Sequence, residues 1–226
     1  MREHSRITTV LEKTGKISGR LRTPTSRWLG GEKTKEALYA ENGCTFRFNV
    51  DTCYFSPRLA EQRKILAGLV KRGERVLVLF GGVGPFAIVI GKTTKAKEVV
   101  SVELGNFHSQ YARENVKRNK VAVEVVQGDV QKVLPRFAQA GRVFDRIVMA
   151  RPNLKNMFLS SALPLTKKGT TIHYYGFCHE DALDELKQTL LAEGKKKGYA
   201  LRILKVSKAG DIGMRTYRYR IDMKVS

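Results

Sequence analysis

The sequence predicts a mixed α/β fold, in which helices cover both faces of a mostly parallel sheet. Three observations predict it. From Arg75 onward, extended and helical patterns alternate, as is typical of parallel sheets buried on both faces. The last two extended runs have no helix between them, so we expect an antiparallel hairpin that closes the sheet. Before Tyr54 the chain has only short extended runs and turns, which indicates a small β-rich subdomain. We therefore divide the chain into residues 1–53 and 54–226.

The N-terminal part contains a strong turn signal at Asn42-Gly43, between two extended runs, which predicts a hairpin. Ser56 and Pro57 then suit the N-cap and first position of a helix. Apolar residues at helical spacing should form the buried face of that helix. These residues are Leu59, Ile65, Leu66, Leu69 and Val70.

The alternating region predicts seven strands and four further helices. The expected strands are residues 76–80, 98–104, 121–126, 145–150, 170–177, 200–207 and 215–225. The expected helices are residues 107–119, 130–137, 153–163 and 181–197. In the last strand, Arg218 and Arg220 alternate with Tyr217 and Tyr219, so we expect one basic, solvated face and one aromatic face in the core.

The charge of the chain is its most informative bulk property. There are 42 Lys and Arg against 21 Asp and Glu among 226 residues, a formal net charge of +21. Folding does not require such an excess, which favours a polyanionic partner such as nucleic acid. The basic residues are spread along the chain, which indicates a folded basic surface rather than a disordered arm.

The remaining composition limits the other classes of function. No run approaches the roughly 18 apolar residues of a membrane span, so we expect no membrane partner. The N-terminus has no apolar signal segment; we expect a cytoplasmic protein, with a mitochondrial presequence as the alternative. The three cysteines and four histidines are too scattered to predict a metal site. The oligomeric state does not follow from the sequence.

Three successive predicted strands end in residues that suit a nucleoside. Gly82 and Gly84 follow the first strand, Glu103 ends the second, and Asp129 follows the third. Glycines allow close approach of a ligand, and an acidic residue about 20 positions later can accept hydrogen bonds from ribose hydroxyls. The glycines alone also fit a dinucleotide fingerprint or a simple tight turn. Because nothing else would clamp phosphates, we prefer S-adenosylmethionine to NAD.

Several segments together resemble a known family. They are GRLR (19–22), WLGGE (28–32), ENG (41–43), YFSPRLAEQR (54–63), FGGVGPF (80–86), FDRIVMARP (144–152) and GTTIHYYGF (169–177). In this order and spacing they resemble the archaeal and eukaryotic tRNA (guanine37-N1)-methyltransferases, and also the wybutosine-pathway aminocarboxypropyl transferases. The resemblance implies a Rossmann-like class I methyltransferase sheet with a terminal antiparallel hairpin. It also implies S-adenosylmethionine as cofactor and the tRNA anticodon stem-loop as partner.

The resemblance further implies roles for individual residues. Tyr54 and Arg58 would hold the methionine moiety, Glu103 would bind the ribose and Asp129 would face the adenine. Arg22 would contact the target guanine, and Pro152 would belong to the catalytic motif after the fourth strand. The cofactor loop would comprise Phe80, Gly82, Val83, Gly84 and Phe86.

The chain departs from the family pattern at three positions. The family's catalytic glutamate is Gln62 here, and an amide cannot take the proton from guanine N1. Glu61 is adjacent but lies about 100° around the helix. The family's asparagine is Ala150, and its aspartate at the end of the first strand is Val78. We also expect the family's additional N-terminal tRNA-binding domain to be missing.

Three hypotheses follow. The first is an active tRNA guanine N1-methyltransferase that uses Glu61 or a relayed water as base. The second is a related enzyme that modifies another base or transfers an aminocarboxypropyl group. The third is a catalytically silent RNA-binding paralogue. For RNA contact we expect an arginine cluster around the cofactor site. Its members would be Arg22, Arg27, Arg58, Arg63 and Arg151.

Overall fold

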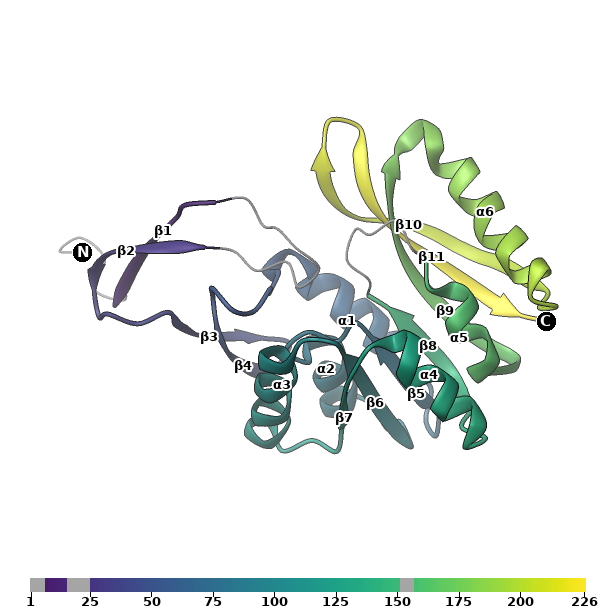
Figure 1. Ribbon diagram of the computed structural model, residues 1–226, viewed down its shortest axis with the longest axis horizontal. Coiled ribbons are helices and arrows are strands. Elements are labelled where there is room, and N and C mark those ends of the chain that lie inside the picture. Colours follow the sequence, from purple (N-terminus) through teal and green to yellow (C-terminus); the bar gives the residue numbers. More distant parts are fainter. Residues whose placement is uncertain (1–6, 16–24, 151–156) are drawn as a thin grey trace.

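The computed structural model describes residues 7–15, 25–150 and 157–226. Its centre is a seven-stranded sheet in the order β10-β11-β9-β8-β5-β6-β7 (Figure 1). β11 runs antiparallel to both neighbours, whereas β5 to β9 are parallel to one another. The strands are β5 (Arg75–Leu79), β6 (Glu98–Glu103), β7 (Glu124–Gln127), β8 (Phe144–Met149), β9 (Thr166–His179), β10 (Leu201–Gly213) and β11 (Thr216–Val225).

Helices cover both faces of this sheet. One apolar core lies between the sheet and the helices α1 (Ala60–Leu69), α2 (Pro85–Thr93) and α3 (Asn106–Asn119). A second core lies on the opposite face, under α4 (Val130–Gln139), α5 (Leu159–Ala162) and α6 (Leu183–Lys196). Short 3₁₀ turns, η1 (Pro57–Leu59), η2 (Leu163–Leu165) and η3 (Glu180–Ala182), precede or follow helices. No described helix is both long and apolar enough to cross a membrane.

Two hairpins precede the sheet. β1 (Thr9–Lys13) pairs with β2 (Ser26–Gly31), and β3 (Glu36–Glu41) pairs with β4 (Cys44–Asn49). The turn at Asn42 and Gly43 has φ values of 49° and 70°, as in the tight hairpin turns that Asn-Gly favours. β4 packs on α3 and shares the core of α1 and α2. The expected β-rich N-terminal part is thus confirmed, while a domain boundary at residue 53 stays a prediction.

Most expected elements are present, although β9 and β10 are longer than expected and three further differences occur. β7 begins only at Glu124, so the expected strand residues 121–123 are not part of it. α5 is shorter than expected, because it begins after residues 157 and 158. The remainder of the expected helix, residues 153–156, lies outside the described residues. In α1 the predicted buried stripe is wrong for Ile65 and Leu69, which are exposed; the buried face is Arg63, Leu66 and Ala67.

The prediction of a solvated arginine face on the last strand is wrong for Arg220, whose side chain is only 3% exposed. β11 lies inside the sheet rather than at its edge, and its residues from Tyr219 to Met223 are buried in succession, so both of its faces are covered there. Burial of the charge is compensated by Asp222, whose Oδ1 accepts a hydrogen bond from Arg220 Nε at 3.0 Å and lies 2.6 Å from His173 Nδ1. Tyr219 is buried in the opposite core, as expected.

Candidate cofactor-binding crevice

The glycine-rich loop after β5 contains several residues in a backbone conformation that glycine adopts most easily. Phe80, Gly82 and Gly84 have φ values of 61°, 56° and 89°, in the left-handed region. A Cβ on Gly81 would lie 2.0 Å from the hydroxyl oxygen of Ser101 on β6. The N–H of Gly84 donates to the carbonyl of Gly81 at 3.0 Å, which closes the turn before α2. The sequence therefore uses glycine to fold the loop tightly against β6.

Glu103, at the carboxyl end of β6, joins three loops at this edge of the sheet. Its Oε2 accepts the N–H of Gly82 at 2.8 Å, and its Oε1 accepts the N–H of Gly105 at 2.8 Å. Its main-chain carbonyl accepts the N–H of Gly128, also at 2.8 Å. Glu103 as a whole residue is buried, with 8% of its surface exposed. Each carboxylate oxygen can accept a second hydrogen bond, so Glu103 can bind a diol while it holds the loop.

The other loop residues support this backbone from behind. Val83 is buried, and its carbonyl accepts a hydrogen bond from Asn115 Nδ2 at 3.2 Å. Phe86 packs beside Tyr175 with ring centroids 5.6 Å apart, and Phe80 meets Phe158 edge-on at 5.1 Å. These side chains fix the loop in place, which leaves its backbone as the surface for a ligand.

Asp129 lies after β7, at the same edge as Glu103, and caps α4. Its Oδ1 accepts the N–H of Gln131 at 2.9 Å. This capping contact accounts for an acidic residue at the position. A contact between Asp129 and adenine stays a prediction.

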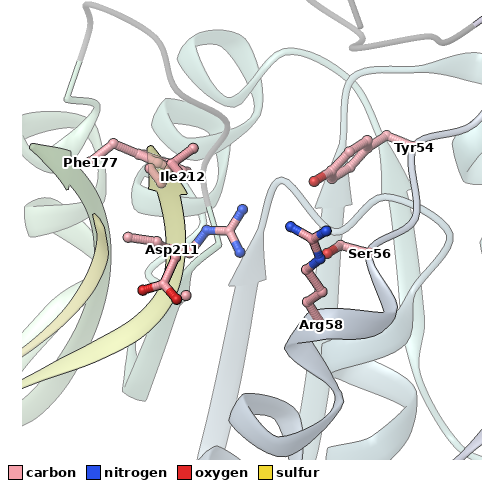
Figure 2. A pocket seen from close by; sticks show the side chains of 8 residues that line it. Tyr54, Ser56, Arg58, Phe177, Asp211 and Ile212 are labelled. Atoms are coloured by element: carbon pink, nitrogen blue, oxygen red, sulfur yellow. The ribbon is translucent and has the colours of Figure 1, made fainter. Parts of the chain in front are cut away.

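A pocket of about 180 Å³ separates the segment before α1 from the β10–β11 hairpin. Tyr54, Ser56 and Arg58 line one side, and Phe177, Asp211 and Ile212 line the other (Figure 2). Gly210 and Arg218 complete the lining. Arg218 also lies over the ring of Phe177, with 5.0 Å between its Cζ and the ring centroid. Two guanidinium groups thus border one small pocket.

The candidate catalytic residues are only partly within the described residues. Arg22 and Pro152 lie outside them. Glu61 is exposed on the first turn of α1. Gln62 is half-buried, and its Oε1 accepts a hydrogen bond from Arg220 Nη1 at 3.2 Å. Because a guanidinium only donates hydrogen bonds, the amide oxygen must face Arg220 and the amide N–H₂ group must point elsewhere.

The expected arginine cluster is corrected by the structure. Arg63 is 1% exposed and forms a bidentate ion pair with Glu41 on β3, because α1 presents it to the core. Arg27 pairs with Glu12 within the β1–β2 hairpin. Only Arg58 of the described members lines the pocket. Arg22 and Arg151 lie outside the described residues.

Sequence reasoning missed two residues next to the crevice. His108 accepts the N–H of Tyr54 at its Nε2, 3.2 Å away, and is buried beside Glu103. Arg218 was recognised as basic but not as part of a pocket. The sequence did carry a signal for His108, because a histidine five positions after Glu103 lies in the first turn of the following helix. Nothing in the sequence places β11 beside Tyr54.

The strand order and the crevice together define a Rossmann-like methyltransferase fold. The model of the TRM5/TYW2 methyltransferase domain matches residues 37–202. The chain therefore belongs to the TRM5/TYW2 methyltransferase family, which uses S-adenosylmethionine.

Individual relatives agree with this membership. The chain is 30% identical to the tRNA (guanine(37)-N(1))/4-demethylwyosine(37)-methyltransferase Taw22 of Nanoarchaeum equitans, over 99% of this chain and 90% of that protein. It is 32% identical to Trm5b of Pyrococcus abyssi, over 99% of this chain but 66% of that protein.

Two solved structures show the same fold. The crystal structure of Trm5b from Pyrococcus abyssi superimposes with a TM-score of 0.86 at 31% identity, and covers 100% of this chain and 66% of that chain. TYW2 from M. jannaschii, solved in complex with AdoMet, has a TM-score of 0.80 at 27% identity, and covers 88% of this chain and 90% of that chain.

Proposed function

We propose that this chain methylates tRNA at N1 of guanine 37, with S-adenosylmethionine as methyl donor. The observation that carries the proposal is the set of hydrogen bonds around Glu103. Its carboxylate holds the glycine loop and the start of α3, and its main-chain carbonyl holds the loop before α4, all at one edge of the sheet. In an open α/β sheet, that edge is where nucleosides bind.

The residues at this edge fit the cofactor. Glu103 would accept hydrogen bonds from the ribose hydroxyls, and the backbone of the loop from Phe80 to Phe86 would lie along the adenosyl group. Tyr54 and Arg58 would hold the methionine end, where the Arg58 guanidinium complements a carboxylate. The cofactor supplies an electrophilic methyl group on a sulfonium, so the protein mainly has to position the target nitrogen in line with it.

Removal of the N1 proton of guanine is the step for which this chain lacks the family's glutamate. Gln62 cannot take a proton, and its Oε1 already accepts from Arg220. Its N–H₂ group can instead donate to the guanine O6, where negative charge develops as N1 loses its proton. In this proposal Arg22 supplies a second donor to O6, and the proton leaves to Glu61 or to water.

The tRNA substrate is supported by charge and by the relatives. The net charge of +21 suits a polyanion. The pocket bordered by Arg58 and Arg218 places cations beside the candidate methionine site. Both relatives compared above are named as methyltransferases of guanine 37 in tRNA. We infer that the anticodon stem-loop enters from this side.

A direct experiment tests the proposal. Unmodified tRNA transcripts with guanine or adenine at position 37 are incubated with the protein and methyl-labelled S-adenosylmethionine, then digested to nucleosides and analysed by mass. The proposal expects 1-methylguanosine from the guanine transcript alone. A different methylated nucleoside, or none while the cofactor binds, contradicts it.

A second candidate is a catalytically silent RNA-binding paralogue. The presence of Gln62 in place of the family's glutamate favours it, because an amide cannot act as a general base. The same digestion decides: no modified nucleoside, together with tight tRNA binding, supports this second function. If the protein is given tRNA that carries 4-demethylwyosine at position 37, gain of an aminocarboxypropyl group would instead assign it to the activity for which another relative, from Methanocaldococcus jannaschii, is named.

A further inference from the structure

His108 is a buried histidine that the proposed mechanism does not yet use. It is the third residue of α3 and only 3% exposed. Its Nε2 accepts the main-chain N–H of Tyr54, so in the neutral ring Nδ1 must carry the proton. Among the described residues, Nδ1 has no hydrogen-bond partner. A buried donor without a partner costs about 1–3 kcal/mol and calls for an explanation.

The surroundings of Nδ1 point to the crevice. A Cβ on Gly105 would lie 2.4 Å from His108 Nδ1 and 3.3 Å from Glu103 Oε1, so the ring and the carboxylate both lie next to the same point beside this glycine. Burial lowers the pKa of His108, and the nearby Glu103 carboxylate opposes that shift. The main chain of Tyr54 also lies close to the glycine loop, because a Cβ on Gly82 would lie 3.9 Å from the carbonyl oxygen of Tyr54. His108 thus stands between the Tyr54 segment and the acidic residue of the crevice.

We propose that His108 is a positioning residue of the cofactor site, which fixes Tyr54 at the mouth of the crevice and directs its Nδ1–H toward the Glu103 carboxylate that binds the ribose. This inference rests on the proposed function. The arrangement also requires glycine at position 105, because any Cβ there would displace the imidazole ring of His108. Gly105 itself has a φ of −70°, which every residue adopts, so its need for glycine comes from His108 and not from the backbone.

The test measures affinity for S-adenosylmethionine and for S-adenosylhomocysteine by calorimetry. We expect H108A to weaken both about tenfold, the value of one positioned hydrogen bond. We expect H108Q to recover part of the loss, because its amide oxygen can accept from Tyr54. G105A should weaken binding similarly, by displacing the ring. In the double variant G105A/H108A the glycine substitution should add little further loss, because the ring it displaces is gone.

Two controls make the result specific. N119A removes another buried polar side chain of α3, which bonds to β4 at the far end of the helix, and should lower the melting temperature without changing cofactor affinity. Circular dichroism verifies that each variant is folded. If H108A and G105A bind the cofactor as tightly as the unaltered chain does, the positioning role is overturned but the proposed function stays intact. No cofactor binding by the unaltered chain overturns both.

Discussion

Arg220 Nη1 lies 3.2 Å from Oε1 of Gln62, and this hydrogen bond joins the last strand of the sheet to the first turn of α1. Arg220 is itself held by Asp222, which also contacts His173. His173 Nε2 in turn lies 2.5 Å from Arg146 Nη1, and Arg146 is paired with Glu74. A buried polar chain therefore ends at the side chain that occupies the position of the family's base.

This relationship predicts the effect of Gln62→Glu. A carboxylate at position 62 would supply a base, and general base catalysis is worth about 10²–10⁴-fold. Arg220 would, however, lower the pKa of the new carboxyl and weaken it as a base. We expect Q62E to raise the methylation rate at pH 7, and Q62E/R220M to raise it further. Single-turnover rates measure this, and an unchanged rate in both variants would show that the base is not limiting.

The unaltered chain should show a matching pH profile. Without a base of suitable pKa, the reactive species is guanine that has already lost its N1 proton, so the single-turnover rate should keep rising as pH increases above 7. If Glu61 is the base, the profile should instead level off and E61Q should abolish activity. If the rate does not change with pH and E61Q is fully active, neither prior loss of the N1 proton nor proton removal by Glu61 explains the reaction.

Glu103→Gln should disturb the crevice while leaving the sheet intact. An amide keeps one acceptor oxygen but turns an N–H₂ group toward one of the two N–H donors of Gly82 and Gly105. We expect about a 10- to 100-fold loss of S-adenosylmethionine affinity, since a hydrogen bond to a charged group is worth about 1.5–3 kcal/mol. Calorimetry measures this. E124Q, on the neighbouring strand and half-exposed, is the matched control and should bind normally.

Acid should destabilise the fold through its buried histidines. Burial lowers the pKa of His173, as do Arg146 and Arg220, while Asp222 opposes the shift; burial likewise lowers the pKa of His108. Between its lowered folded pKa and about 6.5, each ring binds a proton when unfolded but not when folded. The free energy of unfolding should therefore fall below pH 6.5, by at most about 1.4 kcal/mol per pH unit for each ring.

Urea unfolding at pH 7.5, 6.5 and 5.5 measures this dependence. H173N removes one of the two rings and should flatten it. The lowered pKa of Asp222 acts in a separate window, near and below pH 3.8, so it does not confuse the result. An equal slope in H173N and the unaltered chain would rule out His173 as a source.

The buried pair of Glu41 on β3 and Arg63 on α1 should be essential for the β3–β4 hairpin to stay packed against α1. Arg63 also donates to the carbonyl of Ser56 at 3.0 Å, beside the pocket. Loss of one partner leaves an uncompensated buried charge, which costs about 3–5 kcal/mol. We expect E41A to lower stability by this amount, and E41A/R63M to recover part of it. Chemical denaturation measures both; a loss under about 1 kcal/mol for E41A would contradict the prediction.

Binding to tRNA should weaken steeply with salt. Each phosphate contact contributes about 0.7–0.9 to the log–log slope. R58A and R218A should each reduce the magnitude of that slope by about this amount if the pocket faces RNA. R202A is the matched control, because Arg202 is exposed at the opposite end of β10 from the pocket and should leave the slope unchanged. Filter binding at several salt concentrations measures it, and equal slopes for all variants would exclude the pocket as an RNA contact.

The sequence by itself determined the sheet, the glycine loop and the acidic residue after the second strand of the alternating region. These features depend on local patterns: alternation of strands and helices, glycines where φ is positive, and Asn42-Gly43 in a turn. Such patterns are visible because each involves residues close together in the chain.

Only the tertiary structure decided which polar groups meet. Residues 62 and 220 are far apart in sequence, and Arg220 is buried on a strand that is covered on both faces, where it contacts Gln62 of α1. Arg63 was expected at the surface, but helix α1 turns it toward Glu41. His108 of α3 accepts a hydrogen bond from the main chain of Tyr54, 54 positions earlier. These contacts depend on how strands and helices pack, and a linear pattern of residue types carries no record of that packing.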